Sequence, residues 1–220
     1  MNSIKIYTSD VTSIKIGSSA VTSVYVGSDK VYPSQVPIVG CDYKLCGICT
    51  DGTEITVSSG TTTTLTRQEI YNALGEKYLL ECEIGSGTTT LGEYAFDDNY
   101  HTNYHSILYV SSITISDSVT WLQHECLMDC YNLTTLTIPS SVTQIDFWAF
   151  TRLSGLTEVI FEGDTPPTFT NYMNGVFHDY CPPVIYVPDS AVSEYRAING
   201  YVWTNQDWSR DIIQPISNRP

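Results

Sequence analysis

The chain opens with three ten-residue phrases in which aliphatic and polar side chains alternate. They read IKIYTSDVTS, IKIGSSAVTS and VYVGSDKVYP and begin at Ile4, Ile14 and Val24. Alternation with a period of two predicts short strands, and four-residue turns between them predict an antiparallel β-meander with one aliphatic face. A sheet this small cannot enclose a core, so its apolar face must pack on the rest of the chain or on a second subunit.

A hairpin and a helix are predicted next. Two alternating runs, YKLCGIC and EITV, flank the Asp-Gly pair at 51–52, which is the strongest short-range signal for a hairpin turn. In LTRQEIYNALGEK, Thr66 is placed as the N-cap of a helix and Glu69 as its capping-box partner. Leu65 and Ile70 can form the accompanying hydrophobic staple.

A longer repeat dominates the second half of the chain. Pairs of aliphatic or aromatic residues recur in SITIS, TLTIP and EVIFE at steps of 23 residues, and a fourth pair in VIYVP follows after 26. The segments GEYAF, QHECL, DFWAF and NGVF also correspond. A fixed step in the twenties predicts a solenoid with one short strand per unit, in which neighbouring units bury a common spine. These paired inward positions are Ile113/Ile115, Leu136/Ile138, Val159/Phe161 and Ile185/Val187.

The predicted fold is therefore mainly β and has three parts. Residues 1–34 form an N-terminal antiparallel β-meander for attachment or oligomerisation, and residues 35–88 form a hairpin-helix adaptor. Residues 89–220 form a leucine-rich-repeat solenoid with a C-terminal cap. The first repeat carries an insertion, DDNYHTNYHSILYV, over residues 97–110.

Charge excludes several classes of partner. The formal net charge is −14, with only ten Lys and Arg residues, so a phosphate backbone would be repelled and no nucleic acid is expected. No apolar run reaches the roughly 18 to 20 residues needed to span a bilayer, so membrane insertion is not expected either. The N-terminus lacks the basic start and continuous apolar run of a signal peptide, which favours a protein made and assembled in a cytoplasm.

The seven cysteines are expected to be reduced thiols. The spacing Cys41-x4-Cys46-x2-Cys49 invites a metal or redox interpretation, but in a strand Cys46 and Cys49 point to opposite faces and cannot share a metal. Cys126 and Cys130 are expected to be buried structural thiols. We therefore predict no metal site and no cofactor.

The histidines provide the remaining candidate chemistry. Together with nearby carboxylates they could serve a hydrolase, but no nucleophile elbow, HExxH motif or phosphate loop accompanies them, so no catalytic residue is predicted. The 97–110 insertion, rich in Tyr and His, is an alternative binding loop on a rigid scaffold. The residues considered for catalysis are His101, His105, His124, Asp97, Asp98 and Glu125.

Strand alternation defines a candidate binding face. If the repeated aliphatic pairs point inward, the intervening residues of successive strands point outward and form a polar surface with two large apolar side chains, suited to a protein or glycan; a merely solvated face is the alternative. The predicted partner-binding residues are Thr114, Thr135, Thr137, Glu158, Ile160 and Tyr186.

The repeat resembles the leucine-rich repeats of BspA-like proteins. LGEYAF, DCYNLTTLTIPSSVTQIDFWAF and LSGLTEVIFEG follow that family's pattern, Cys130 occupies the position of its buried cysteine, and the ending from Ile185 to Ile216 resembles its C-terminal closing segment. The resemblance covers about residues 89–216. It implies a fold rather than a function, because such repeats serve adhesion and protein contacts of many kinds.

The N-terminal third resembles virion proteins of phages from Bacteroides-type bacteria, on the phrase VTSIKIGSSAVTSVYVGSDKVYP and the following DGT and TLTRQEI segments. This resemblance implies a non-enzymatic tail or head fibre located in the virion. The N-terminal region would bind other virion proteins, and the solenoid would bind a host cell-surface protein or glycan. A homo-oligomer such as a trimer would cover the exposed aliphatic sheet. The alternatives are a bacterial BspA-like surface adhesin and a glycan-degrading virion enzyme dependent on Asp97 or Asp98.

Overall fold

The computed structural model confirms a mainly β chain with few helices. Within the part that it describes, no helix has the length and hydropathy to cross a bilayer. The described residues are 41–97, 109–170, 175–177, 182, 184–198, 200–203 and 210–220, together with the strands at 4–6, 24–26 and 29–31.

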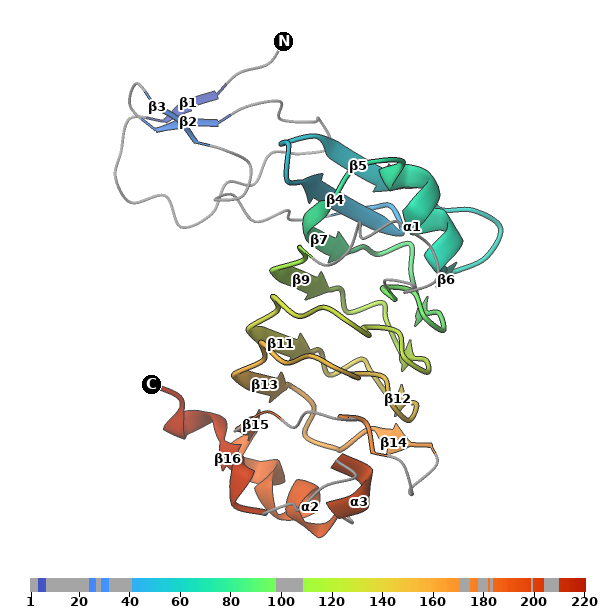
Figure 1. Ribbon diagram of the computed structural model, residues 1–220. Helices are drawn as coiled ribbons and strands as arrows, with labels where there is room; N and C mark the ends of the chain where they lie inside the picture. The colour runs from blue at the N-terminus through green and yellow to red at the C-terminus, as the bar shows by residue number, and fades with distance from the viewer. Residues whose placement is uncertain are drawn as a thin grey trace.

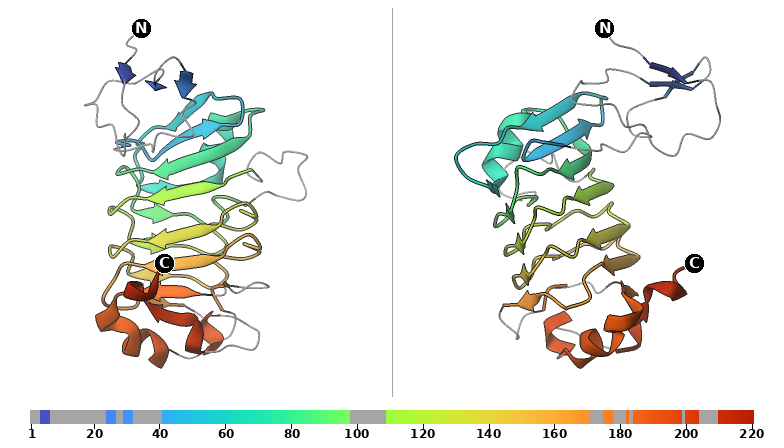
Figure 2. Two further views of the ribbon diagram at one scale, coloured as in Figure 1. Left: turned by 90° about the vertical axis from the view of Figure 1, so that its left-hand side faces the viewer. Right: turned by 180° about the vertical axis from the view of Figure 1, so that it is seen from behind.

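Most of the described chain is a stack of repeats with a ladder of parallel strands on each side (Figure 1). On the long-strand side β7 pairs with β9, and β11, β13, β15 and β16 pair in that order. β9 and β11 lie side by side and continue the ladder (Figure 2). These strands are β7 (Leu79–Ile84), β9 (Ser112–Ile115), β11 (Thr135–Ile138), β13 (Glu158–Phe161), β15 (Ile185–Val187) and β16 (Ile213–Pro215).

The opposite ladder consists of two-residue strands, each hydrogen-bonded in parallel to the strand of the next repeat. Such short strands suffice because the flanking turns also form backbone hydrogen bonds between repeats. The Thr143 N–H donates to the Thr120 carbonyl, and the Thr168 N–H donates to the Thr143 carbonyl. The strands are β6 (Thr64–Leu65), β8 (Thr90–Leu91), β10 (Trp121–Leu122), β12 (Gln144–Ile145) and β14 (Thr168–Phe169).

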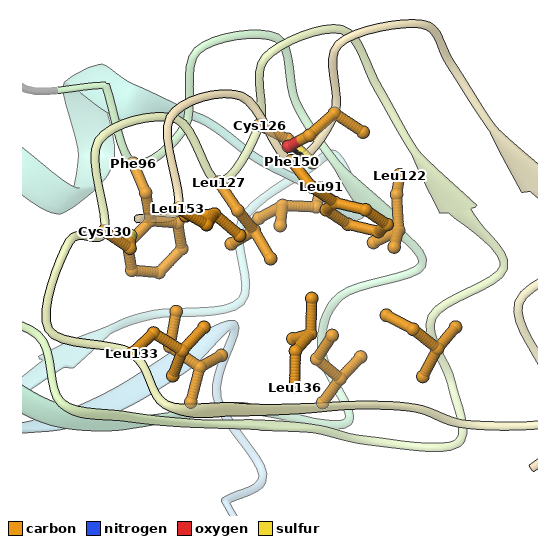
Figure 3. Close-up of a cluster of buried hydrophobic side chains, with 14 of the residues drawn as sticks. Leu91, Phe96, Leu122, Cys126, Leu127, Cys130, Leu133, Leu136, Phe150 and Leu153 are labelled. Carbon is orange, nitrogen blue, oxygen red and sulfur yellow. Dashed lines mark hydrogen bonds between the residues drawn. The ribbon is translucent and has the colours of Figure 1, made fainter. Parts of the chain in front are cut away.

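The core fills the space between the two ladders. Register aligns Leu136 with Val159, Val159 with Ile185 and Ile185 with Ile213, and all four side chains are completely buried. Figure 3 shows side chains of both sides pointing toward one another, Leu133 and Leu136 from the long-strand side and Leu91 and Leu122 from the other. The predicted inward position of the repeated aliphatic pairs is thus confirmed. The buried members are Ile113, Ile115, Leu136, Ile138, Val159, Phe161, Ile185 and Val187.

The hairpin and the helix that the sequence predicts are present, and they close the N-terminal end of the stack. Strand β4 (Leu45–Cys49) pairs antiparallel with both β5 (Glu54–Val57) and β7, and the turn between β4 and β5 has Gly52 at φ +80°. Helix α1 (Arg67–Leu74) has the predicted capping box between Thr66 and Glu69. Because β7 also pairs with β9, the predicted adaptor shares one core with the repeats.

A buried lysine joins this hairpin to the helix. The Lys44 side chain is fully buried, and its Nζ donates to Glu69 Oε1 at 2.7 Å, to the Thr64 carbonyl at 2.7 Å and to Thr62 Oγ1 at 3.3 Å. Burial by itself would raise the pKa of Glu69, but hydrogen bonds from Lys44 and Thr66 lower it overall. One ammonium group therefore fixes the start of β4, the first short strand and the first turn of α1 together.

The C-terminal end of the stack is covered by short helices and aromatic rings. Trp203 and Tyr195 are completely buried; Tyr195 stacks on Trp203, and both rings contact Phe161. The Tyr195 hydroxyl donates to the Gly163 carbonyl at 3.1 Å. The elements of this end are η2 (Asp189–Ala191), α2 (Val192–Ala197), α3 (Gly200–Trp203), η3 (Arg210–Ile212) and η4 (Ile216–Asn218).

The N-terminal strands pair differently from the predicted meander. β1 (Ile4–Ile6) pairs in parallel with β2 (Val24–Val26), and β2 forms an antiparallel hairpin with β3 (Asp29–Val31). A meander would place the second phrase, at 14–16, between the first and the third. That phrase lies outside the described residues, whereas β1 and β2 pair directly, Ile4 with Val24.

Shortening Leu136 to Ala tests the shared spine. Leu136 is fully buried between its neighbours, so the substitution should lower the free energy of unfolding by about 3 kcal/mol through lost burial and the cavity left behind. Thr137→Ala, the next residue on the opposite face of β11, should cost no more than about 0.5 kcal/mol. Urea denaturation measures both, and equal effects would contradict the spine.

The Lys44–Glu69 pair predicts a pH-dependent stability. Glu69→Gln keeps a capping residue but leaves the buried ammonium without its carboxylate, which should cost about 2 kcal/mol at pH 7. Because the pKa of Glu69 is lowered from its ordinary 4.5, the carboxylate stabilises the fold fully above that pH and progressively less as the pH falls through the lowered value. The difference between wild type and variant in urea denaturation should therefore shrink below pH 4.5. Glu54→Gln, an exposed control, should show no such change, and a pH-independent difference for Glu69→Gln would contradict the pairing.

Candidate functional site

The predicted partner-binding residues share the outer face of the long-strand ladder. Register places Thr135 opposite Glu158, Thr137 opposite Ile160, and Ile160 opposite Tyr186. Thr114 lies on the same face of β9, next to Glu83 of β7. The common face is therefore confirmed, and the role of these residues in binding stays a prediction.

Two of the predicted residues are not available on this surface. Ile160 is only 5% exposed and Tyr186 only 8%, so the expectation of two large apolar side chains facing a partner is wrong. The chain after β16 returns across the face, where Arg219 Nη2 donates to Glu158 Oε1 at 2.6 Å (Figure 2). This hydrogen bond, opposed by partial burial and aided by Thr135, lowers the pKa of Glu158. The sequence pattern could not reveal the cover, because Arg219 lies 61 residues from its partner.

The open part of the long-strand face is polar. Thr114 is exposed, Thr135 and Thr137 are half-buried, and the surface continues through Ser112 to Glu81, which pairs with Ser112 in the register. Partial burial raises the pKa of Glu81. We call this surface the strand face: Glu81, Ser112, Thr114, Thr135 and Thr137, a flat array of hydroxyl groups with a carboxylate at one side.

A second surface lies at the turns that follow the short strands, and sequence reasoning missed it. Corresponding residues of four repeats have a left-handed backbone there: Tyr94 at φ +57°, Glu125 at +51°, Trp148 at +61° and Gly175 at +65°. This conformation points backbone N–H groups at the next repeat. The Tyr94 N–H donates to the His124 carbonyl, and the Trp148 N–H donates to the Gly175 carbonyl. Glycine at the fourth position is the sequence signal for this turn, because glycine alone adopts it without strain.

Aromatic rings gather along this line of turns. Tyr94 and His124 meet edge to face at 5.3 Å between ring centroids, His124 lies 4.2 Å from Phe147 and 5.6 Å from Trp148, and Phe147 meets Trp148 at 5.6 Å. Tyr94 is 36% exposed and the other three rings are half-buried. We call Tyr94, His124, Phe147 and Trp148 the aromatic ridge, which runs across three successive repeats.

Carboxylates surround the aromatic ridge. Burial raises the pKa of Glu125, with His124 opposing and Asp97 adding to the shift, and the Tyr94 hydroxyl donates to this carboxyl group. The nearby cations bind other acids: Arg67 contacts Asp97 at 3.2 Å, and Arg152 contacts Asp129 at 3.2 Å. The ridge therefore lies in a locally acidic environment.

The cysteines differ in part from the prediction. Cys41 and Cys46 form a disulfide, so the expectation of reduced thiols is wrong for this pair, whose sulfur atoms are brought together by the turn into β4. Cys46 and Cys49 do lie on opposite faces of β4, and Cys49, Cys82, Cys126 and Cys130 are buried free thiols. Cys181 lies outside the described residues.

Of the residues considered for catalysis, the three that the structure describes lie near one another, since both His124 and Asp97 act electrostatically on Glu125. Among the described residues, no group of three His, Cys, Asp or Glu side chains could hold a metal ion. His124 packs in the aromatic ridge, and Asp97 binds Arg67. His101, His105 and Asp98 lie outside the described residues, as does most of the 97–110 insertion.

The comparisons identify the repeat. Residues 71–191 match the BspA type leucine rich repeat region in six copies, which is more than half of the chain. The protein therefore belongs to this family. The match begins within α1, earlier than residue 89, where the sequence pattern places the first repeat. A search of curated proteins finds no match to the chain.

The left-handed backbone at Trp148 predicts that glycine at this position is more stable than alanine, which is the reverse of their order in a helix. Both Trp148→Ala and Trp148→Gly lose the ring contacts, but glycine removes the strain of φ +61° and should leave the protein about 1 kcal/mol more stable than alanine does. In α1, where the backbone is helical, Ala73→Gly should instead destabilise by about 1 kcal/mol. Thermal denaturation of the three variants checks this, and an alanine variant at 148 as stable as the glycine variant would contradict it.

Proposed function

We propose that the protein is a non-enzymatic binding protein whose repeats present a rigid surface to a partner. The observation that carries this proposal is the strand face: hydroxyl groups of β9 and β11 that face outward from strands fixed by a continuous buried spine. Side chains on such a scaffold lose little conformational freedom on binding, which favours recognition. The family supports a surface or binding role of this kind.

We further propose that the chain is a structural protein of a phage virion, a tail or head fibre. Its repeat region would form a capped solenoid that points outward, and its N-terminal third would attach to other virion proteins as a homo-oligomer. The resemblance of the N-terminal phrases to virion proteins supports this assignment. The partner of the strand face would be a host cell-surface protein or glycan.

A bacterial surface adhesin is the second candidate, because the repeat family fits it equally well. The Cys41–Cys46 disulfide is compatible with either location, since disulfides persist on virions and on cell surfaces rather than in a reducing cytoplasm. The two candidates share the strand face and differ in what carries the chain.

Immunogold electron microscopy distinguishes them. An antibody against the purified chain should label phage particles from a producing culture and leave the surface of uninfected cells unlabelled. Label on uninfected cells and none on particles would overturn the virion assignment in favour of the adhesin.

Introducing positive charge on the strand face tests its role separately. Thr114→Arg with Thr137→Arg should reduce retention of the fluorescently labelled chain on host cells by about tenfold or more, because two bulky cations would break surface complementarity. Thr143→Arg, at a threonine beside the short-strand ladder that is exposed like Thr114, is the control and should bind like wild type. Unchanged retention of the double variant would contradict binding through this face.

A further inference from the structure

We propose that the aromatic ridge is a binding site for a neutral, linear glycan. The inference rests on the proposed binding function but assigns a second surface, on the opposite side of the stack from the strand face. Its ligand class follows from three properties of the ridge: the spacing of its rings, the polar groups beside them and the local charge.

The ridge repeats at the spacing of the stack. Tyr94, His124 and the Phe147–Trp148 pair belong to three successive repeats, whose short strands pair directly. Neighbouring paired strands lie about 4.8 Å apart, which is close to the length of one hexopyranose unit in an extended glycan. A linear glycan along the stack can therefore place successive sugar rings over successive repeats.

The rings are suited to the apolar faces of sugars. The C–H groups of a pyranose face carry partial positive charge and stack on the negative face of an aromatic ring. Edge contacts between Tyr94 and His124, and between Phe147 and Trp148, hold the four rings as one rigid group. Their partial exposure leaves apolar surface on rings that need little further ordering.

Hydrogen-bonding groups follow the ridge on the side of the short strands. Gln123 Oε1 accepts from the Glu93 N–H at 3.1 Å, and Asp146 Oδ1 accepts from Gln144 Nε2 at 3.1 Å and from Thr170 Oγ1 at 2.9 Å. Glu93 and Gln123 directly precede the ridge residues Tyr94 and His124 in the sequence. Carboxylates and amides at this position match the hydroxyl groups at the edge of a sugar ring.

Charge selects among glycans. Glu93 is exposed beside the ridge, Glu125 lies within it, and the arginines nearest to it already bind Asp97 and Asp129. Among the described residues the acids beside the ridge outnumber Arg67 and Arg152, of which Arg152 also acts on Glu125, so an anionic glycan would be repelled and a neutral one would not. A basic side chain of a protein would match the local charge, but a single side chain would not span the rings of three successive repeats.

Affinity electrophoresis of the full chain tests the site with hydroxyethyl cellulose, laminarin and mannan as neutral probes and hyaluronan as the anionic probe. At least one neutral polysaccharide should retard the protein, and hyaluronan should not. Phe147→Ala and Trp148→Gly should each weaken the retardation by about tenfold. Tyr109→Ala, at an exposed tyrosine whose ring contacts that of Tyr78 and, within the described part of the chain, none of the ridge rings, and the Thr114→Arg with Thr137→Arg variant should be retarded like wild type.

Three outcomes would overturn the proposal: no retardation by any neutral probe, equal retardation of wild type and ridge variants, or strongest retardation by hyaluronan. Ridge-dependent binding to polylysine without binding to the neutral probes would assign the ridge to a basic protein instead. Since the strand-face variant is expected to behave like wild type here, failure of the ridge leaves the cell-binding test of the strand face unaffected. Circular dichroism of each variant verifies that it is folded.

Discussion

Burial of each repeat by its neighbours is the interaction on which the rest of this structure depends. A strand of four residues such as β11 cannot cover its own aliphatic side chains, and Leu136 is fully buried only because Val159 and the opposite short strands lie against it. The same stacking aligns the outer residues of successive strands. The strand face and the aromatic ridge are therefore consequences of one packing arrangement, on two sides of the stack.

A stack of this kind has two ends, and each end is closed by a different physical device. At the N-terminal end the buried ammonium group of Lys44 links the hairpin to α1 through Glu69. This ion pair orients the helix on the hairpin, but it is lost in acid, where Glu69 becomes protonated. At the C-terminal end the large buried rings of Trp203 and Tyr195 cover the last repeats, and the Tyr195 hydroxyl adds a hydrogen bond to the Gly163 carbonyl. The chain then returns over the long strands, so closure of the fold also reduces the binding surface.

The left-handed turns connect stability with recognition. Bulky residues at Tyr94 and Trp148 adopt a backbone that favours glycine, and the inter-repeat hydrogen bonds of their N–H groups hold them there. Because this backbone strain is tolerated at corresponding positions of two repeats, the large rings of Tyr94 and Trp148 lie at the surface instead of in the core. This arrangement is the reason to assign a ligand to the ridge.

The sequence by itself determined the repeat length, the inward pairs, the hairpin turn, the capping box of α1 and the opposite faces of Cys46 and Cys49, because each depends on local periodicity or a few neighbouring residues. Only the tertiary structure decided the direct pairing of β1 with β2, the Cys41–Cys46 bond, the burial of Ile160 and Tyr186, the hydrogen bond of Arg219 to Glu158, and the gathering of the ridge from three repeats. These features join residues that are far apart in the sequence, or depend on backbone angles that side-chain patterns do not encode. Periodicity predicts which way a side chain points, but only the packed chain determines what covers it.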